Sequence, residues 1–255
     1  MRQLFHREVG SGPSLIILHG LFGSSDNWVT IAKALSDTYK VITIDLRNHG
    51  KSFHDSAFTY EDMAMDVKEF IAINELEGTI VMGHSMGGKV AMHLATHYDL
   101  IDALIVVDIS PKYYPVHHQT ILLGLNSIDL DTLTSRKEAD ETLSKFIPEQ
   151  GIRQFLLKNL TRNEDGKFFW KINLGTIQNK IENVGEALSP AFRFEKPTLF
   201  IGGAKSAYIR PSDWKSIESI FPGSKIIEIT GAGHWVHAEQ PEQFVKIVRE
   251  FISGI

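Results

Sequence analysis

A serine between closely spaced glycines, in the run GHSMG at residues 83–87, is the clearest candidate for chemistry in the chain. An apolar run at 79–82 predicts a short buried strand before it, and the run at 88–95 predicts a helix after it. A serine on such a sharp strand-to-helix turn is exposed, and glycines are needed where side chains would clash across the turn. We therefore take Ser85 as the candidate nucleophile.

A serine hydroxyl attacks a carbonyl well only when a base accepts its proton and a third group orients that base. His234, in the glycine-rich run GAGHW at 231–235, is the candidate base. Asp108 directly follows an apolar run at 103–107 that predicts a strand, and it is the candidate acid. Along the chain the three residues come in the order Ser85, Asp108, His234. This is the order nucleophile, acid, histidine that accompanies a serine on a strand-to-helix turn of this kind.

The position of the acid leaves two further residues to weigh. The loop after the strand expected at 198–201 contains Ser206 and no carboxylate, so Ser206 either supports the triad by a hydrogen bond or simply forms a turn. Asp213 is the fallback for the acid, although its place near the start of a predicted helix favours a first-turn role.

Two backbone N–H groups must bind the negative oxygen that forms during acyl transfer. Met86 directly follows the nucleophile and supplies the first. The run HGLFGS at 19–24 follows an apolar strand-like run, and we expect the second from Leu21 or, alternatively, Phe22. His19 is expected to hold this loop in place.

Other polar groups are expected to be structural. The loop at 45–52 suits a rigid support built on hydrogen bonds. His93 and His97 are four residues apart, but no third ligand accompanies them, so we expect no metal and no cofactor. His117 and His118 are expected on the surface. Aromatic side chains near the serine and histidine turns are candidates for lining a substrate pocket: Phe22, Tyr113, Tyr114, Tyr208 and Trp235.

The composition is that of an ordinary soluble globular protein. The 255 residues are 43% hydrophobic and 22% charged, with a formal net charge of −5 and no block of lysine or arginine. Nucleic acid and anionic membrane surfaces are therefore unfavoured partners, and no apolar run reaches the roughly 20 residues that span a bilayer. There is no cysteine, which excludes a thiol nucleophile. No secretory signal is evident at the start, so we expect a cytoplasmic protein that acts on a small molecule.

Apolar runs and helical periodicity alternate along the chain, and this predicts a mostly parallel sheet flanked by helices, an α/β fold. Residues 1–8 alternate like a strand. Further strands are expected at 15–18, 41–44, 79–82, 103–107, 198–201 and 225–229. Helices are expected at 27–35, 60–76, 86–97, 212–220 and 241–252.

The alternation stops between residues 110 and 196, where no strand of the central type is evident. Periodicity predicts helices at 116–127, 132–146, 151–160 and 174–187. We expect residues 1–110 and 196–255 to form the core and residues 111–195 to form an inserted helical cap, or lid. A cap inserted there would lie over the carboxyl ends of the strands, where open α/β sheets bind ligands.

Several motifs together carry a resemblance. They are HG at 19–20, D-x-R-x-H-G-x-S at 45–52, GHSMGGK at 83–89, VDISP at 107–111 and GAGHWVHAE at 231–239. With them the chain resembles the α/β-hydrolase superfamily over nearly its whole length, and more narrowly the bacterial YbfF-type esterases. The serine at 206, where most members of the superfamily have aspartate, agrees with this subfamily.

The resemblance implies a serine esterase that hydrolyses carboxylic esters, with acyl-CoA thioesters as a further class of substrate. It also implies that Asp108 is the acid of the triad. A hydrolase or lyase acting on C–C bonds would keep the same triad and is the alternative, and a homologue that binds a ligand without catalysis is a second one. The segment at 112–195 carries no motif that names a substrate, and the oligomeric state is not specified.

Overall fold

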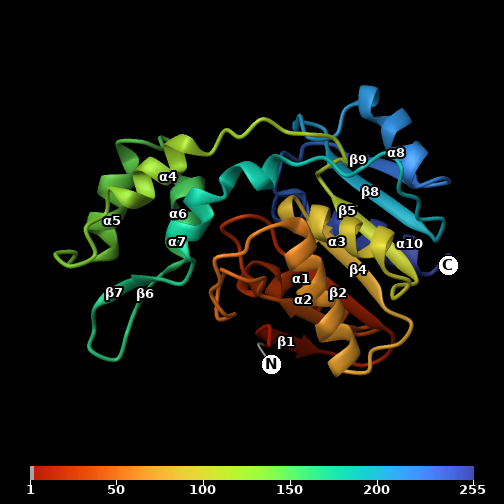
Figure 1. Ribbon diagram of the computed structural model, residues 1–255, viewed down its shortest axis with the longest axis horizontal. Coiled ribbons are helices and arrows are strands. Elements are labelled where there is room, and N and C mark those ends of the chain that lie inside the picture. Colours follow the sequence, from red (N-terminus) through yellow and green to blue (C-terminus); the bar gives the residue numbers. More distant parts are fainter. Residues whose placement is uncertain (1–2) are drawn as a thin grey trace.

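Parallel strands form the centre of the computed structural model, which describes residues 3–255 (Figure 1). Within these residues a seven-stranded sheet has the order β1-β3-β2-β4-β5-β8-β9, and only β1 runs antiparallel to its neighbour. The strands are β1 (His6–Val9), β2 (Ser14–Leu18), β3 (Lys40–Ile44), β4 (Ile80–His84), β5 (Ala103–Val107), β8 (Thr198–Gly203) and β9 (Lys225–Ile229).

Helices cover both faces of this sheet, and the strand sequences show why. In β2, Ile16 and Leu18 pack in one apolar cluster, while Leu15 and Ile17 pack in the other, because successive side chains of a strand point to opposite faces. The first cluster includes side chains of α2 (Tyr60–Ile73), α3 (Met86–His97) and α8 (Trp214–Ile220), and the second includes those of α1 (Val29–Leu35), α9 (Val236–Glu239) and α10 (Pro241–Ile252).

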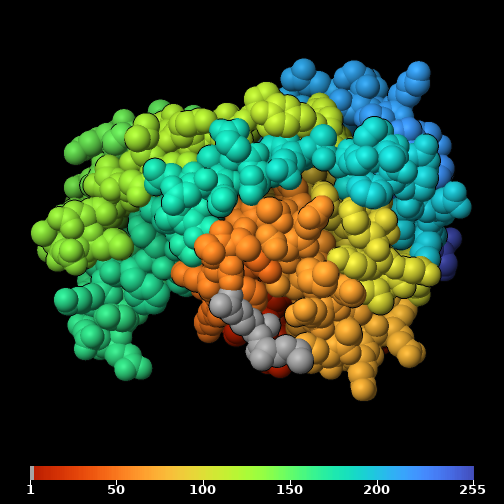
Figure 2. Space-filling model, in the orientation of Figure 1, coloured from red at the N-terminus to blue at the C-terminus, as the bar shows by residue number. Residues whose placement is uncertain are grey.

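The residues between β5 and β8 form a lobe that extends beyond the sheet (Figure 1), and this lobe protrudes from the molecule in the space-filling view (Figure 2). Its elements are α4 (Gln119–Asn126), α5 (Arg136–Ser144), α6 (Gln150–Leu157), β6 (Leu160–Arg162), β7 (Phe168–Trp170), α7 (Leu174–Asn179) and the 3₁₀ helix η2 (Ile181–Gly185). We refer to residues 111–195 as the inserted segment. Figure 1 shows that two extended stretches connect it to the core side by side.

The predicted α/β fold with a mostly parallel sheet is confirmed, and each central strand lies within two residues of its expected bounds. Met1 and Arg2, the start of the strand expected at 1–8, lie outside the described residues. In the inserted segment the helix expected at 151–160 ends earlier, at Leu157, because the chain turns into the hairpin β6–β7.

The turn of this hairpin explains the difference. Asn163 N donates to Lys167 O at 2.9 Å, and Gly166 takes the positive φ of 77° that closes the turn. The Asn-Glu-Asp-Gly run at 163–166 is a turn signal that lies between the helices expected at 151–160 and 174–187.

No helix within residues 3–255 has the length and apolar character that crossing a membrane requires.

Candidate active site

Ser85 lies on the turn between β4 and α3 with φ 52° and ψ −117°, a strained conformation for a residue with a side chain. Its N–H donates to Val107 O at 2.9 Å, which ties the turn to the neighbouring strand. A Cβ on Gly83 would lie 2.1 Å from Gly87 O, and one on Gly87 would lie 2.4 Å from Leu18 O. The two glycines are therefore sterically required, as the motif predicts.

The sheet register places the candidate nucleophile and the candidate acid at the same edge. His84 pairs with Val107, and Val107 pairs with Ile201 on the next strand. Ser85 and Asp108 each follow one member of the first pair, so both leave the carboxyl ends of adjacent parallel strands. This is the edge at which open α/β sheets bind ligands.

Asp108 is completely buried, and its carboxylate takes part in three hydrogen bonds. His234 Nδ1 lies 2.7 Å from Asp108 Oδ2, and Ser206 Oγ donates to the same oxygen at 2.5 Å. Gly203 N donates to the other oxygen, Oδ1, at 3.1 Å. A carboxylate bonded to Nδ1–H fixes the tautomer in which His234 Nε2 is unprotonated and able to accept a proton.

The candidate base, His234, lies beside His84, the residue that precedes Ser85. The rings of His84 and His234 are 4.7 Å apart, and His84 Nε2 donates to the backbone oxygen of His234 at 2.8 Å. Burial lowers the pKa of His84 well below its usual value, so it stays neutral. Tyr208 stacks on the His234 ring at 4.2 Å. Within the described chain no hydrogen bond joins Ser85 Oγ to His234, a contact that often tightens only when substrate binds.

The loop at residues 19–24 packs directly against the nucleophile. A Cβ on Gly20 would lie 3.3 Å from Ser85 Cβ. Phe22 N donates to His49 Nε2 at 3.2 Å, so this amide is already engaged. Within residues 3–255 the amides of Leu21 and Met86 have no hydrogen-bond partner. The geometry therefore favours the pair Leu21 and Met86 over Phe22 as oxyanion donors.

Hydrogen bonds from the loop at 45–52 support this region, as expected. Asp45 Oδ1 accepts from Ser25 N at 2.6 Å, and Asp45 Oδ2 accepts from Lys51 N at 2.8 Å. His19 Nε2 accepts from Leu46 N at 3.0 Å, while its Nδ1 donates to Gly20 O at 2.8 Å. Burial lowers the pKa of His19, which favours the neutral ring that these two bonds require.

A small cavity of about 30 Å³ lies beside Ser85. The core lines it with Leu21, Tyr60, Ser85, Met86, Ile109 and Tyr208, and the inserted segment lines it with Tyr114, Pro115, Val116, His117, His118, Val184 and Gly185. Tyr114 Oη donates to the backbone oxygen of Tyr208, which joins the two walls. The inserted segment therefore contributes about half of the lining.

The predicted pocket residues divide into two groups. Tyr114 and Tyr208 line the cavity, whereas Phe22, Tyr113 and Trp235 lie outside it. Tyr113 is exposed, and Phe22 is buried. The Trp235 ring packs 5.8 Å from that of Phe155 in α6.

The sequence interpretation missed the histidines of the inserted segment. His117 is exposed, as expected, and His118 is half-buried, but both line the cavity, and His117 Nε2 lies 3.1 Å from Tyr208 Oη. Burial lowers the pKa of His118 to about 4. Nothing in the local sequence indicates this location, because it depends on how the segment crosses the core.

A buried lysine is a second residue that the sequence interpretation missed. Lys89 in α3 donates from Nζ to Lys112 O and to Glu186 O, both at 2.6 Å, and these carbonyls lie at the two ends of the inserted segment. Burial lowers the pKa of Lys89 to about 7.

Asp213, the fallback for the acid, accepts hydrogen bonds from Lys112 Nζ at 2.6 Å and from Arg210 N at 2.9 Å.

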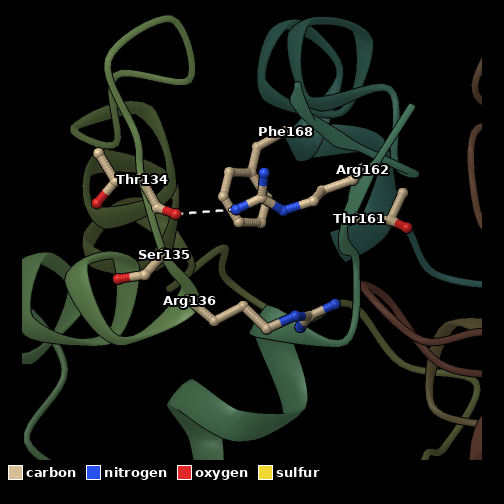
Figure 3. A pocket seen from close by; sticks show the side chains of 6 residues that line it. All are labelled: Thr134, Ser135, Arg136, Thr161, Arg162 and Phe168. Carbon is tan, nitrogen blue, oxygen red and sulfur yellow. Dashed lines mark hydrogen bonds between the residues drawn. The ribbon is translucent and has the colours of Figure 1, made fainter. Parts of the chain in front are cut away.

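A larger pocket of about 420 Å³ lies within the inserted segment, between α5 and the hairpin β6–β7 (Figure 3). Its side chains belong to Thr134, Ser135, Arg136, Thr161, Arg162 and Phe168, and none of them lines the cavity beside Ser85. The two arginines donate to backbone carbonyls: Arg162 Nη2 donates to Thr134 O at 2.8 Å, and Arg136 Nη1 donates to Leu157 O at 2.6 Å. Ser135 caps α5. These groups hold the segment together and form no nucleophile–base pair.

Metal ligands are not gathered anywhere in residues 3–255, where no cluster of three or more histidine, cysteine, aspartate or glutamate residues could hold an ion. The rings of His93 and His97 stack on each other at 5.3 Å.

Comparisons with known proteins agree with this geometry. A family model described as the alpha/beta hydrolase fold matches residues 13–124. The chain is 38% identical to the sn-1-specific diacylglycerol lipase ABHD11 of Danio rerio, over 96% of this chain and 80% of that one. It is 34% identical to Esterase YbfF of Escherichia coli, over 94% of this chain and 92% of that one.

Among solved structures, a marine microorganism esterase superposes with a TM-score of 0.95 at 44% identity and covers 98% of this chain and all of its own. E-2-(acetamidomethylene)succinate hydrolase superposes with a TM-score of 0.79 at 23% identity, over 98% of this chain and 95% of that one. The second likeness shows the fold alone.

Proposed function

Because this chain belongs to the α/β-hydrolase family, among its YbfF-type esterases, we propose that it hydrolyses carboxylic esters through an acyl-enzyme on Ser85. The observation that carries the proposal is the hydrogen bond between the buried Asp108 carboxylate and His234 Nδ1. This pair lies beside the turn that holds Ser85 in a strained conformation. The names of the relatives, esterase and lipase, support the ester as the substrate class.

In the first half of the reaction His234 Nε2 accepts the proton of Ser85 as Oγ attacks the ester carbonyl. The negative oxygen of the tetrahedral intermediate accepts hydrogen bonds from the Leu21 and Met86 amides, which have no other partner to compete with it. The C–O bond to the alcohol breaks, and the alcohol leaves with the proton from His234. Asp108 stabilises the imidazolium that exists between these two transfers.

In the second half a water molecule gives its proton to His234 and attacks the acyl carbon. The second intermediate collapses, Ser85 takes back a proton, and the carboxylic acid leaves. The same steps apply to an acyl-CoA thioester, with a thiol as the leaving group. No step requires a cofactor.

The inserted segment is proposed to act as the cap of this site and to limit the size of the acyl group. It supplies about half of the lining, and the cavity of about 30 Å³ has room for one or two water-sized groups. We therefore expect longer acyl chains to bind only when the inserted segment moves. We expect the highest kcat/KM for short acyl chains.

The test is hydrolysis of an acyl series, from acetyl to dodecanoyl, as p-nitrophenyl esters and as CoA thioesters, with product analysis. We expect release of an acid with an alcohol or thiol, and a fall in kcat of about 10⁴ or more for Ser85→Ala. Retention of most activity in Ser85→Ala would contradict the mechanism. No turnover of any ester or thioester by the wild-type chain would contradict the substrate class and favour C–C chemistry on the same triad.

A further inference from the structure

The loop at residues 19–24, which we call the oxyanion loop, contains a bulky residue, Phe22, in a backbone conformation that glycine usually provides. Gly23 N donates to Gly20 O at 2.9 Å, which closes a four-residue turn with Phe22 in its third position. Phe22 has φ 60°. A phenylalanine in this region is strained and persists there only when its surroundings hold it.

Both polar backbone groups of Phe22 are held from outside the turn. Its N–H donates to His49 Nε2 at 3.2 Å, a contact made by the core. Its carbonyl accepts from Asn159 Nδ2 at 2.7 Å, a contact made by the inserted segment 137 residues further along the chain. The Phe22 ring also lies 6.2 Å from that of His118.

The surroundings of Asn159 fix its side chain in the orientation that makes this contact. It lies between α6 and β6 and is 2% exposed. Its Nδ2 also donates to Leu156 O at 3.2 Å, so two carbonyl acceptors fix which end of the side-chain amide faces the loop. Its own carbonyl accepts from Lys171 N at 2.8 Å, which anchors it to the residue after β7.

We propose that Asn159 is a positioning residue for the oxyanion hole, supplied by the inserted segment to hold the Phe22 carbonyl and thereby aim the Leu21 amide. A turn that relaxes toward the φ that phenylalanine prefers rotates the adjoining peptides and moves the Leu21 N–H away from Ser85. The inference rests on the proposed function, because it concerns the same oxyanion. It makes the docking of the inserted segment part of the catalytic geometry as well as part of the pocket wall.

Asn183 offers a matched control. It too is an asparagine of the inserted segment whose Nδ2 donates to a backbone carbonyl of the core, Phe58 O, at 2.9 Å. Phe58 lies outside the oxyanion loop. Loss of either asparagine therefore removes one bond between segment and core, and only loss of Asn159 releases the Phe22 carbonyl.

The experiment compares Asn159→Ala, Asn159→Asp and Asn183→Ala in the full chain with a short-chain p-nitrophenyl ester. Active sites are counted by fluorophosphonate titration, so that kcat refers to folded enzyme. We expect kcat to fall about 10- to 100-fold in both Asn159 variants with KM within about threefold, a fraction of the 10²- to 10³-fold loss typical of deleting an oxyanion donor. Asn183→Ala should keep kcat within about threefold.

A second readout is inhibition by an alkyl boronic acid, which forms a tetrahedral adduct with the serine. Its affinity should fall in Asn159→Ala by about the same factor as kcat/KM, as expected for a lost interaction with the tetrahedral state. Asn159 variants with the kcat and boronate affinity of Asn183→Ala would overturn this inference alone. No ester turnover by the wild-type chain would overturn the proposed function and this inference with it.

Discussion

The nucleophile turn and the oxyanion turn both contain a non-glycine residue with positive φ, but different parts of the molecule hold them. Ser85 is fixed by the core alone, through its N–H on Val107 and through glycines that admit no Cβ. Phe22 is fixed by the core at its N–H and by the inserted segment at its carbonyl. In the proposed mechanism the nucleophile is therefore set by the sheet, whereas stabilisation of the oxyanion depends in part on how the inserted segment docks.

After loss of the nucleophile in Ser85→Ala, the largest effect within the core should come from the acid. Asp108→Asn keeps the size of the side chain and presents an amide to His234 Nδ1, which favours the wrong tautomer of the base. We expect kcat for a short-chain ester to fall about 10³- to 10⁴-fold with KM little changed. Asp213→Asn, at the carboxylate bonded to Lys112, is the control and should keep kcat within a few fold. Equal losses in the two variants would remove Asp108 from the triad.

The second prediction concerns the steric requirement at the nucleophile turn. A Cβ on Gly87 would meet Leu18 O at 2.4 Å and His19 O at 2.5 Å, and these are backbone atoms that cannot rotate away. We expect Gly87→Ala to lower the free energy of unfolding by about 3 kcal/mol in urea titrations. Gly175→Ala in the inserted segment has no atom within 4 Å of the new Cβ and should raise it by up to about 1 kcal/mol. A wild-type unfolding midpoint for Gly87→Ala would show that the turn adapts.

A smaller effect is expected when the support of the acid is weakened. Ser206→Ala removes one of the hydrogen bonds on Asp108 and leaves those of Gly203 and His234. Because the carboxylate stays in place, we expect kcat to fall about tenfold, near the lower end of the roughly 1.5–3 kcal/mol that a hydrogen bond to a charged group contributes. A loss as large as that of Asp108→Asn would instead give Ser206 a direct part in the reaction.

The smallest predicted effect concerns His237 and the way in which the free energy of unfolding depends on pH. His237 stacks on Trp28 at 4.0 Å, and burial lowers its pKa to about 3. Below pH 6.5 the unfolded chain therefore binds a proton that the folded chain does not, so the free energy of unfolding falls as the pH falls toward 3. His237→Phe should make this slope shallower by at most about 1.4 kcal/mol per pH unit. Urea titrations between pH 4 and 7 measure it, and an unchanged slope would show that His237 is protonated in the folded chain.

The same comparison explains what the sequence could predict. Ser85 and Asp108 directly follow short apolar strands, and His234 lies in a loop just before the last helices, so local patterns were enough to locate all three. The contact of Asn159 with Phe22 joins residues 137 apart, and it depends on the path of the inserted segment across the core. No periodicity specifies such a path.

The buried lysine was missed for a similar reason. In the sequence Lys89 is only the last residue of the GHSMGGK motif and has no evident structural role, and only the folded chain brings the carbonyls of Lys112 and Glu186 to its Nζ. The hairpin β6–β7 was not predicted, although the run at 163–166 contains a turn signal, because its strands of three residues each are too short for an alternating pattern to indicate them.

The most direct test of the account is the site and rate of labelling by a fluorophosphonate, read by mass spectrometry of peptides. We expect one label per chain on Ser85, none in Ser85→Ala, and labelling slowed by at least about 10²-fold in His234→Gln, because the nucleophile then lacks its base. A label on another residue would contradict the assignment of Ser85 as the nucleophile. An unchanged labelling rate in His234→Gln would contradict the assignment of His234 as the base that activates it.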